Sequence, residues 1–168
     1  MKSIALCGFM GCGKTTISDS IKKLYSIPYI DTDKYIEEKE NMTISAMFEK
    51  YGESYFRDKE YETICELSQK YNIVLALGGG AVMFKRNVEA LKNNGCEIVF
   101  IDTDFDVIID RLKNDTSRPL LKQNDTRALY EKRLPIYNDV CDIKISCKNE
   151  NSDEIARLIF EKIKKVWT

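Results

Sequence analysis

Near its start the chain reads Gly8-Phe9-Met10-Gly11-Cys12-Gly13-Lys14-Thr15, which fits the pattern G-x-x-x-x-G-K-[ST]. Glycines at these positions let the backbone turn tightly, so that successive N–H groups point inward at phosphate oxygens. An apolar run over 3–7 precedes the loop, and a helical pattern with Ile17, Ile21 and Leu24 on one face follows it. This order of strand, loop and helix predicts a loop that binds a nucleoside triphosphate.

Within this loop, each residue has an expected role. Lys14 is expected to reach the outer phosphates and Thr15 to hold Mg²⁺, while the N-terminus of the following helix adds a partial positive charge. Cys12 is expected to contribute its backbone N–H, and a reactive Cys12 thiolate is the alternative. The remaining residues expected to contact the nucleotide are Gly11, Gly13 and Thr16.

The composition limits the classes of protein to consider. A length of 168 residues favours a single domain, and a net charge of −1 with interspersed charges predicts neither a nucleic-acid partner nor an anionic membrane surface. We expect no signal peptide, because a charge-poor strand and the glycine loop directly follow Met1, and no apolar run is long enough for a membrane span. The six cysteines form no C-x-x-C pair and there is no His, which predicts a cytoplasmic protein without a zinc site.

Short apolar runs alternate with helical patterns, which predicts an α/β protein with a parallel sheet wrapped by helices. Strands are expected at 3–7, 28–30, 73–77, 98–102 and 143–145. Helices are expected at 14–25, 33–40, 44–51, 53–70, 85–94, 104–114, 127–137 and 152–166. Thr43 is expected to cap the third of these helices and Gly52 to close it.

Ligands of such sheets bind beyond the carboxyl ends of the strands, which makes the strand-end residues one candidate site. Asp31 and Asp33 flank Thr32, and alternation in an extended segment predicts that both carboxylates point in similar directions. One would act through water on Mg²⁺ and the other would meet a substrate hydroxyl; a helix N-cap with a surface acid is the alternative. The triple glycine 78–80 predicts close approach of a ligand to backbone N–H groups, with a floppy connection as the alternative.

Three arginines add positive charge to this candidate site. Arg57 has Glu60 one turn later on nearly the same helix face, Arg133 precedes Leu-Pro-Ile-Tyr, and Arg118 lies in the polar segment 114–126. A guanidinium suits carboxylates and phosphates because it donates two parallel hydrogen bonds. A solvated surface position is the default interpretation of each arginine taken singly.

Together these motifs resemble shikimate kinase, in that family's order and near its spacing over most of the chain. The matching stretches are the loop 8–15, Asp31-Thr32-Asp33, Gly52-Glu53-Ser54-x-Phe56-Arg57-x-x-Glu60, Leu77-Gly78-Gly79-Gly80, Arg118-Pro119-Leu120-Leu121 and Arg133-x-Pro135-x-Tyr137. The resemblance implies a single three-layer P-loop kinase domain over 1–168, with a five-stranded parallel sheet flanked by helices, a substrate-binding region at about 33–62 and a mobile lid at about 114–126. It also implies phosphorylation of the 3-hydroxyl of shikimate by ATP with Mg²⁺, in the pathway to chorismate and the aromatic amino acids.

The resemblance also implies roles for single residues. Asp33 would bind the shikimate hydroxyls, including the one attacked, and Arg57 and Arg133 would grip the carboxylate with backbone N–H groups around Gly79 and Gly80. The further implied roles are an orienting Glu60, Phe56 near the substrate ring, Arg118 closing onto the phosphates, Arg111 near the nucleotide base and Asp31 in the metal shell. We expect a monomer.

Some features leave alternatives open. The segment between Arg118 and Arg133 is shorter than in many family members, which bears on the lid. Asp102 ends an apolar strand and is typical of a metal-binding acid, although the resemblance favours Asp31.

Another small-molecule kinase of this fold, acting on gluconate or a nucleoside monophosphate, is one alternative function. It would give no reason for the presence of both Arg57 and Arg133. A non-catalytic P-loop regulatory protein is the remaining class, and the guanine-reading motif Asn-Lys-x-Asp of GTPases is absent.

Overall fold

A computed structural model describes residues 2–113, 123–148 and 150–167, and it contains one parallel sheet in the strand order β2-β3-β1-β4-β5. The strands are β1 (Ile4–Cys7), β2 (Tyr29–Asp31), β3 (Val74–Ala76), β4 (Glu97–Thr103) and β5 (Ile143–Cys147). The predicted α/β class, the parallel pairing and the number of strands are confirmed. β1 and β3 are buried along their whole length, as their apolar runs predicted.

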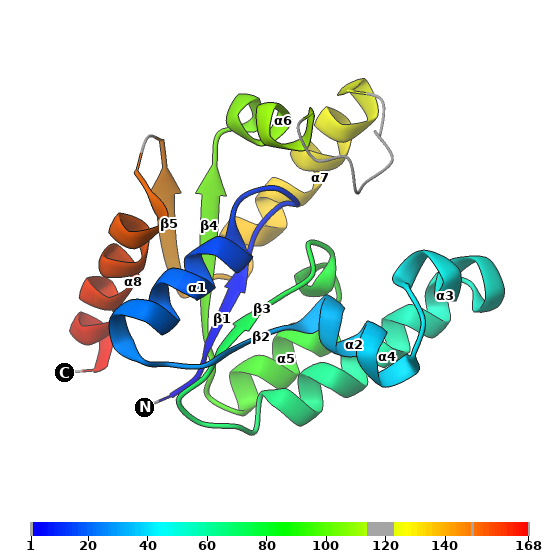
Figure 1. Ribbon diagram of the computed structural model, residues 1–168, viewed down its shortest axis with the longest axis horizontal. Helices are drawn as coiled ribbons and strands as arrows, with labels where there is room; N and C mark the ends of the chain where they lie inside the picture. Colours follow the sequence, from blue (N-terminus) through cyan, green and yellow to red (C-terminus); the bar gives the residue numbers. More distant parts are fainter. Residues whose placement is uncertain (1, 114–122, 149, 168) are drawn as a thin grey trace.

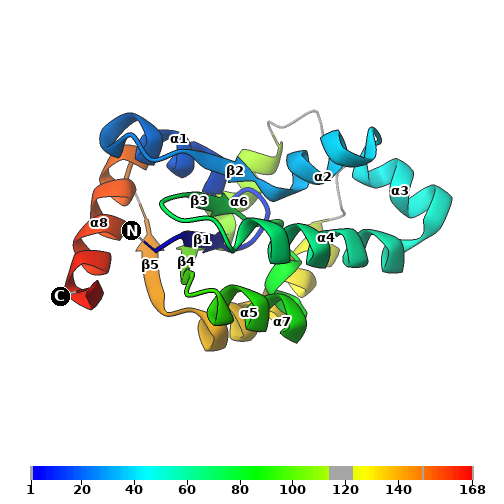
Figure 2. The ribbon, with the colours of Figure 1, turned by 90° about the horizontal axis from the view of Figure 1, so that it is seen from below.

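Helices cover both faces of this sheet, so that the molecule has three layers (Figure 2). One face carries α1 (Lys14–Tyr25) and α8 (Ser152–Trp167), which pack against each other, and the other carries α5 (Lys85–Asn93) and α7 (Gln123–Val140). Helix α6 (Phe105–Lys113) lies beyond the carboxyl ends of the strands (Figure 1). The candidate site therefore lies at the edge of the sheet where the strands end.

A helical extension projects from the sheet beyond β2 (Figure 1). It consists of α2 (Thr32–Glu40), α3 (Ile44–Tyr51) and α4 (Glu53–Leu67). The three helices share a small core of their own, made by Ile36, Met47 and Phe56. The predicted cap is confirmed, because the Thr43 hydroxyl oxygen accepts a hydrogen bond from the N–H of Ala46 at 3.2 Å.

Two predicted helices, α4 and α7, have the wrong bounds. Helix α4 ends at Leu67 and not at 70, because Leu67 is the last residue of the helix that faces the core. Helix α7 begins at Gln123 and runs to Val140 with Pro135 inside it, where the sequence predicted 127–137. The helix continues past the proline because Tyr137 is fully buried and stacks on Phe100 of β4 with ring centroids 5.1 Å apart.

The predicted lid at 114–126 divides into two parts. Its last residues, 123–126, form the first turn of α7, and residues 114–122, including Arg118, lie outside the described residues.

The triple glycine leads into a short 3₁₀ helix, η1 (Ala81–Met83), that the sequence did not predict. Within the described ranges no helix is both long and apolar enough to cross a membrane.

Candidate active site

The loop between β1 and α1 has the backbone that its glycines predicted. Gly8, Gly11 and Gly13 have φ angles of +147°, +77° and +99°, which side chains other than glycine rarely adopt. A Cβ at Gly8 would also lie 2.8 Å from the carbonyl oxygen of Ile101 and 2.9 Å from Sγ of Cys12. Close packing and backbone conformation therefore both require glycine at the start of the loop.

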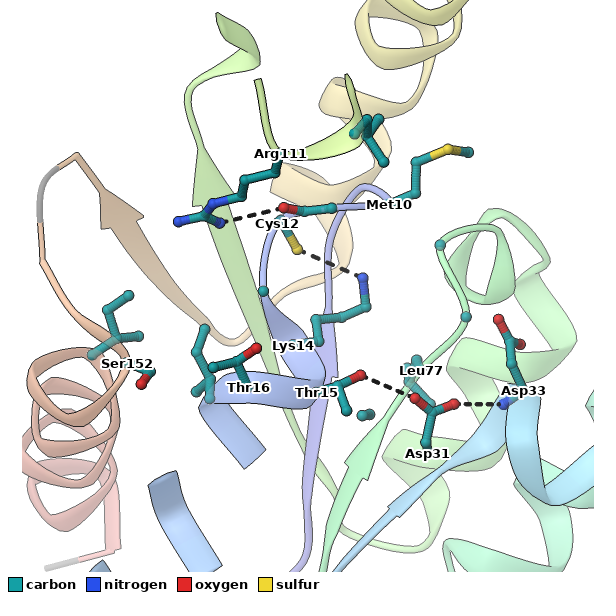
Figure 3. Close-up of a pocket in the computed structure, with 18 of the residues that line it drawn as sticks. Met10, Cys12, Lys14, Thr15, Thr16, Asp31, Asp33, Leu77, Arg111 and Ser152 are labelled. Atoms are coloured by element: carbon teal, nitrogen blue, oxygen red, sulfur yellow. Dashed lines mark hydrogen bonds between the residues drawn. The ribbon is translucent and has the colours of Figure 1, made fainter. Parts of the chain in front are cut away.

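The ammonium group of Lys14 lies inside the curve of the loop (Figure 3). It donates hydrogen bonds to the carbonyl oxygens of Gly8 at 2.8 Å and Phe9 at 3.1 Å, and it lies 3.6 Å from Sγ of Cys12. This position brings the charge to the cavity that the loop borders, as the sequence predicted.

The side chain of Cys12 is buried, although Cys12 is among the residues that line the cavity. It is 2 % exposed, its N–H donates to the carbonyl oxygen of Phe9 at 3.2 Å, and its own carbonyl oxygen accepts from the hydroxyl of Thr103 at 3.2 Å. The burial speaks against the alternative of a reactive thiolate. Because the N–H already serves the turn, a contact between Cys12 and phosphate stays a prediction.

Thr15 and Asp31, the two residues expected to serve a metal ion, are in direct contact. The Thr15 hydroxyl donates to Oδ2 of Asp31 at 3.0 Å, while Oδ1 of Asp31 accepts from the N–H groups of Asp33 at 3.1 Å and Lys34 at 3.2 Å (Figure 3). Asp31 is thus both the N-cap of α2 and the acid beside the phosphate loop. The other candidate acid, Asp102, pairs instead with Lys144 at 2.9 Å.

The prediction that Asp31 and Asp33 point in similar directions is wrong. The chain becomes helical at Thr32, so Asp33 lies in the first turn of α2 and the alternation of an extended strand does not apply. Thr32 is buried and joins the ends of two strands, since its hydroxyl donates to the carbonyl oxygen of Ala76 and accepts from the N–H of Gly78. Asp31 therefore faces the phosphate loop and Asp33 faces the triple glycine.

Each of the three glycines faces one charged side chain from a different helix. A Cβ at Gly78 would overlap the carboxylate of Asp33 from α2. At Gly79 it would lie 3.5 Å from Nη1 of Arg133 in α7, and at Gly80 it would lie 3.0 Å from both Nη1 and Nη2 of Arg57 in α4. The missing side chains at Gly78 and Gly80 thus make room for the carboxylate of Asp33 and the guanidinium of Arg57, whereas the distance at Gly79 is an ordinary contact. This close packing rules against a flexible connection.

Arg57 is held on several sides. Its Nη1 donates to both carboxylate oxygens of Glu60 at 3.1 and 3.2 Å, and its Nε and Nη2 donate to Oε1 of Glu53 at 3.0 and 2.9 Å. Its guanidinium carbon lies 5.1 Å from the ring centroid of Phe56 and 4.9 Å from that of Phe84. The predicted pairing of Arg57 with Glu60 is confirmed.

Glu60 is a buried carboxylate with a second partner that sequence reasoning missed. Burial raises its pKa above the ordinary value, and neighbouring Arg57 offsets part of that rise. Nδ2 of buried Asn87 in α5 lies 3.3 Å from Oε2 of Glu60 and donates to the carbonyl oxygen of Ala81 at 2.8 Å. A signal was present in the sequence, because helical spacing puts Asn87 on the same face as the apolar Leu91.

Arg133 and Tyr137 lie one turn apart on α7 at the middle glycine. The Arg133 guanidinium is 5.9 Å from the ring centroid of Phe9, and the hydroxyl of Tyr137 donates to the carbonyl oxygen of Gly79. Burial raises the pKa of Tyr137, which keeps this hydroxyl protonated as a donor. Tyr137 therefore joins α7 to the glycine turn and fixes the helix that carries Arg133.

Phe56 lies in the core of the helical extension and not in open contact with the cavity. It is 4 % exposed and its ring centroid is 5.3 Å from that of Phe48. Its ring supports the Arg57 guanidinium, so any effect it has on a ligand passes first through that arginine. The predicted contact between Phe56 and a substrate ring stays a prediction.

A cavity of about 520 Å³ runs along the phosphate loop to Asp33 and the glycine turn. Arg111 of α6 borders it and donates from Nη1 to the carbonyl oxygen of Gly11 at 3.3 Å, and Thr16 lines it from α1 (Figure 3). The end of the cavity opposite Asp33 is lined by Glu150, Asn151 and Ser152, which precede or begin α8. Sequence reasoning missed these three, because nothing local in a polar connection marks it as a cavity wall.

Comparisons with known proteins agree on one family. The family described as shikimate kinase matches residues 10–164. A shikimate kinase of Sulfurihydrogenibium sp. is 38 % identical over 98 % of this chain and 99 % of its own length, and one of Clostridium botulinum is 44 % identical over 97 % and 95 %. Among solved structures, the shikimate kinase of Acinetobacter baumannii in complex with shikimate superimposes with a TM-score of 0.90 at 34 % identity, covering 98 % of this chain and 94 % of that one.

Proposed function

This chain belongs to the shikimate kinase family, and on that premise we propose that it transfers the terminal phosphate of ATP to the 3-hydroxyl of shikimate at the cavity described above. One observation carries the assignment of the site. A carboxylate and two guanidinium groups converge on the three glycines 78–80, directly beside the phosphate loop. A small anionic polyol needs this combination, with cationic planar donors at one end and an acceptor for its hydroxyls at the other.

On the acceptor side, Arg57 and Arg133 bind the carboxylate of shikimate, and Asp33 accepts hydrogen bonds from its hydroxyls. Glu60 holds Arg57 in place through bonds of 3.1 and 3.2 Å. N–H groups around Gly79 and Gly80 bind the same carboxylate, a role supported by the approach of Arg133 and Arg57 to these two glycines. The positions of these groups support a pocket that fixes the ring by both ends.

On the phosphate side, the loop N–H groups and Lys14 surround the outer phosphates. In the transfer, the bond between the terminal phosphorus and its bridging oxygen breaks and its electron pair stays on ADP. A bond from the acceptor hydroxyl oxygen to the phosphorus forms, and the hydroxyl proton passes to water. Because such a reaction depends on positioning and on neutralising charge, Asp33 is assigned the orientation of that hydroxyl. Lys14 and the helix N-terminus of α1 neutralise charge on the phosphates.

The residues at the loop also fit a Mg²⁺ ion. Its preferred ligands are oxygens, and the Thr15 hydroxyl and the Asp31 carboxylate supply two kinds of oxygen 3.0 Å apart beside the phosphate loop. Such an ion would supply positive charge to the phosphates. The described residues contain no cluster of three or more His, Cys, Asp or Glu, which is in keeping with an ion held largely by phosphate oxygens and water.

The proposal extends to Arg111, Arg118 and the cellular setting. Arg111 and Thr16 contact the nucleotide from the cavity wall. The family resemblance is the ground on which Arg118 is assigned a contact with the phosphates. The protein acts as a monomer in the cytoplasm. Its cysteines, all free where the structure describes them, fit a reducing compartment.

The direct test is phosphate transfer with purified protein. ATP consumption should depend on shikimate and on Mg²⁺, and the product should be shikimate 3-phosphate by mass spectrometry and NMR. Gluconate and nucleoside monophosphates serve as competing acceptors. Equal turnover with either of them, or ATP consumption that is independent of any acceptor, would overturn the proposed substrate.

A further inference from the structure

The exposed glutamate Glu53 binds one edge of the Arg57 guanidinium. A guanidinium has five N–H donors in one plane, so its binding edges can be counted. Glu60 accepts two hydrogen bonds from Nη1, and the edge between Nη1 and Nη2 faces Gly80, where an added Cβ would be 3.0 Å from both nitrogens. The edge formed by Nε and Nη2 is bound by Oε1 of Glu53, at 3.0 and 2.9 Å.

The two glutamates differ in how easily they can move. The side chain of Glu60 is 1 % exposed and is also bonded by Asn87, whereas the side chain of Glu53 is 62 % exposed at the first turn of α4. Breaking a buried pair strands a charge away from water, but an exposed partner is readily rehydrated. Of the two, Glu53 is the carboxylate that can be exchanged.

We infer that Glu53 stands in for the substrate carboxylate on Arg57, and that the acceptor binds by displacing it. The inference rests on the proposed function, since it takes Arg57 as the group that binds the shikimate carboxylate. One carboxylate replaces another on the Nε–Nη2 edge, so no charge on Arg57 is left unpaired before or after binding. Glu53 is thus a positioning residue that keeps Arg57, only 14 % exposed, aligned between its aromatic neighbours, and it lowers the affinity for the acceptor.

The test compares shikimate binding, measured by calorimetry without nucleotide, in the parent protein and in Glu53→Gln. A neutral amide is a weaker partner for Arg57, so the Kd for shikimate should fall by about two- to fivefold, the range of an exposed ion pair. Glu53→Asp keeps the charge but shortens the reach to Arg57, and it should also tighten binding. In Arg57→Lys, which lacks the planar edge, adding Glu53→Gln should bring no gain.

The matched control is Glu62→Gln on the same helix. Glu62 is 57 % exposed and pairs with Lys59 at 2.9 Å, so the substitution removes the same charge at similar exposure without touching Arg57. Its Kd for shikimate should equal that of the parent. A thermal melt of each variant confirms that it is folded.

Each outcome decides the question. An unchanged or higher Kd for shikimate in folded Glu53→Gln overturns the inference. Glu53 would then have no effect on shikimate binding, or it would help Arg57 to bind shikimate. An equal gain in Glu62→Gln also overturns it, since the effect would be one of overall charge. A parent protein that binds no shikimate overturns the proposed function itself, which separates that failure from the other two.

Discussion

The proposed phosphate side of the site is made by one continuous stretch, Gly8 to Thr15, whereas the proposed acceptor side collects Asp33 from α2, Arg57 from α4 and Arg133 from α7. On the phosphate side, residues that are neighbours in sequence are close in space because the backbone turns. On the acceptor side, the charged groups meet only because three helices pack around one glycine turn. We therefore expect damage to the loop to act on phosphate transfer, and damage to the helix contacts to act on acceptor binding alone.

The largest effect should come from Lys14→Met. Removing a preorganised charge at the phosphates typically lowers the rate by about 10²–10³. We expect kcat to fall by this factor while the Kd for shikimate stays unchanged, measured by steady-state kinetics and calorimetry. Lys22→Met, an exposed lysine in the last turn of the same helix, is the control and should leave both values as they are. Near-parental turnover in folded Lys14→Met would remove Lys14 from the site.

Arg57→Ala should act on the acceptor side only. A hydrogen bond to a charged group is worth roughly 1.5–3 kcal/mol, so the Kd for shikimate should rise at least about tenfold while ATP binding without acceptor is unchanged. Arg57→Lys should restore part of the affinity, because an ammonium lacks the planar fork. Arg157→Ala, which removes an exposed arginine on α8, is the matched control for charge. Equal losses of shikimate and ATP affinity would show that Arg57 is structural.

A smaller effect is expected from Asn87→Ala, which removes a side chain that contacts only protein. Losing its bond to Glu60 loosens Arg57, so the KM for shikimate should rise about three- to tenfold with the KM for ATP unchanged. Asn94→Ala at the end of the same helix removes a bond to Ser68 instead and should leave the KM for shikimate unchanged. A parallel rise of both KM values in Asn87→Ala would mean general damage to the fold.

The smallest effect concerns pH and the buried Glu60. Its raised pKa means that the folded protein holds this proton more tightly than the unfolded chain, so its contribution to stability is greatest at low pH and is lost as pH rises through the raised value. Acceptor affinity changes in the opposite sense, because Arg57 needs ionised Glu60 as its partner. The Kd for shikimate should rise a few-fold as pH falls through that value, which lies above the ordinary pKa of about 4.3.

Calorimetric titrations between about pH 4.5 and 7 measure this dependence. Glu60→Gln is the control, since it removes the titrating group while Asp33 and the substrate carboxylate still titrate. The difference between the two profiles isolates Glu60. Identical profiles would show that the protonation of Glu60 does not govern the acceptor side.

Much of the fold could be predicted from the sequence, because its signals are local. Glycine positions, apolar runs and helical spacing report on backbone geometry within a few residues, and they located the loop, the five strands and the caps around α3. They missed both ends of α7, which runs from Gln123 to Val140 where 127–137 was predicted. They also give no sign of the stacking of Tyr137 on Phe100, because that contact joins the helix to a strand far away in the sequence.

The kinds of side chain in the site, and the family, could also be predicted from the sequence, because the motifs match shikimate kinase over most of the chain. Only the tertiary structure decided how those side chains are arranged: the divergence of Asp31 and Asp33, the approach of one charged group to each glycine, and the places of Asn87 beside Glu60 and of Glu53 beside Arg57. The physical reason is that backbone conformation depends on neighbours along the chain, whereas contacts between side chains depend on how helices far apart in sequence pack on one sheet.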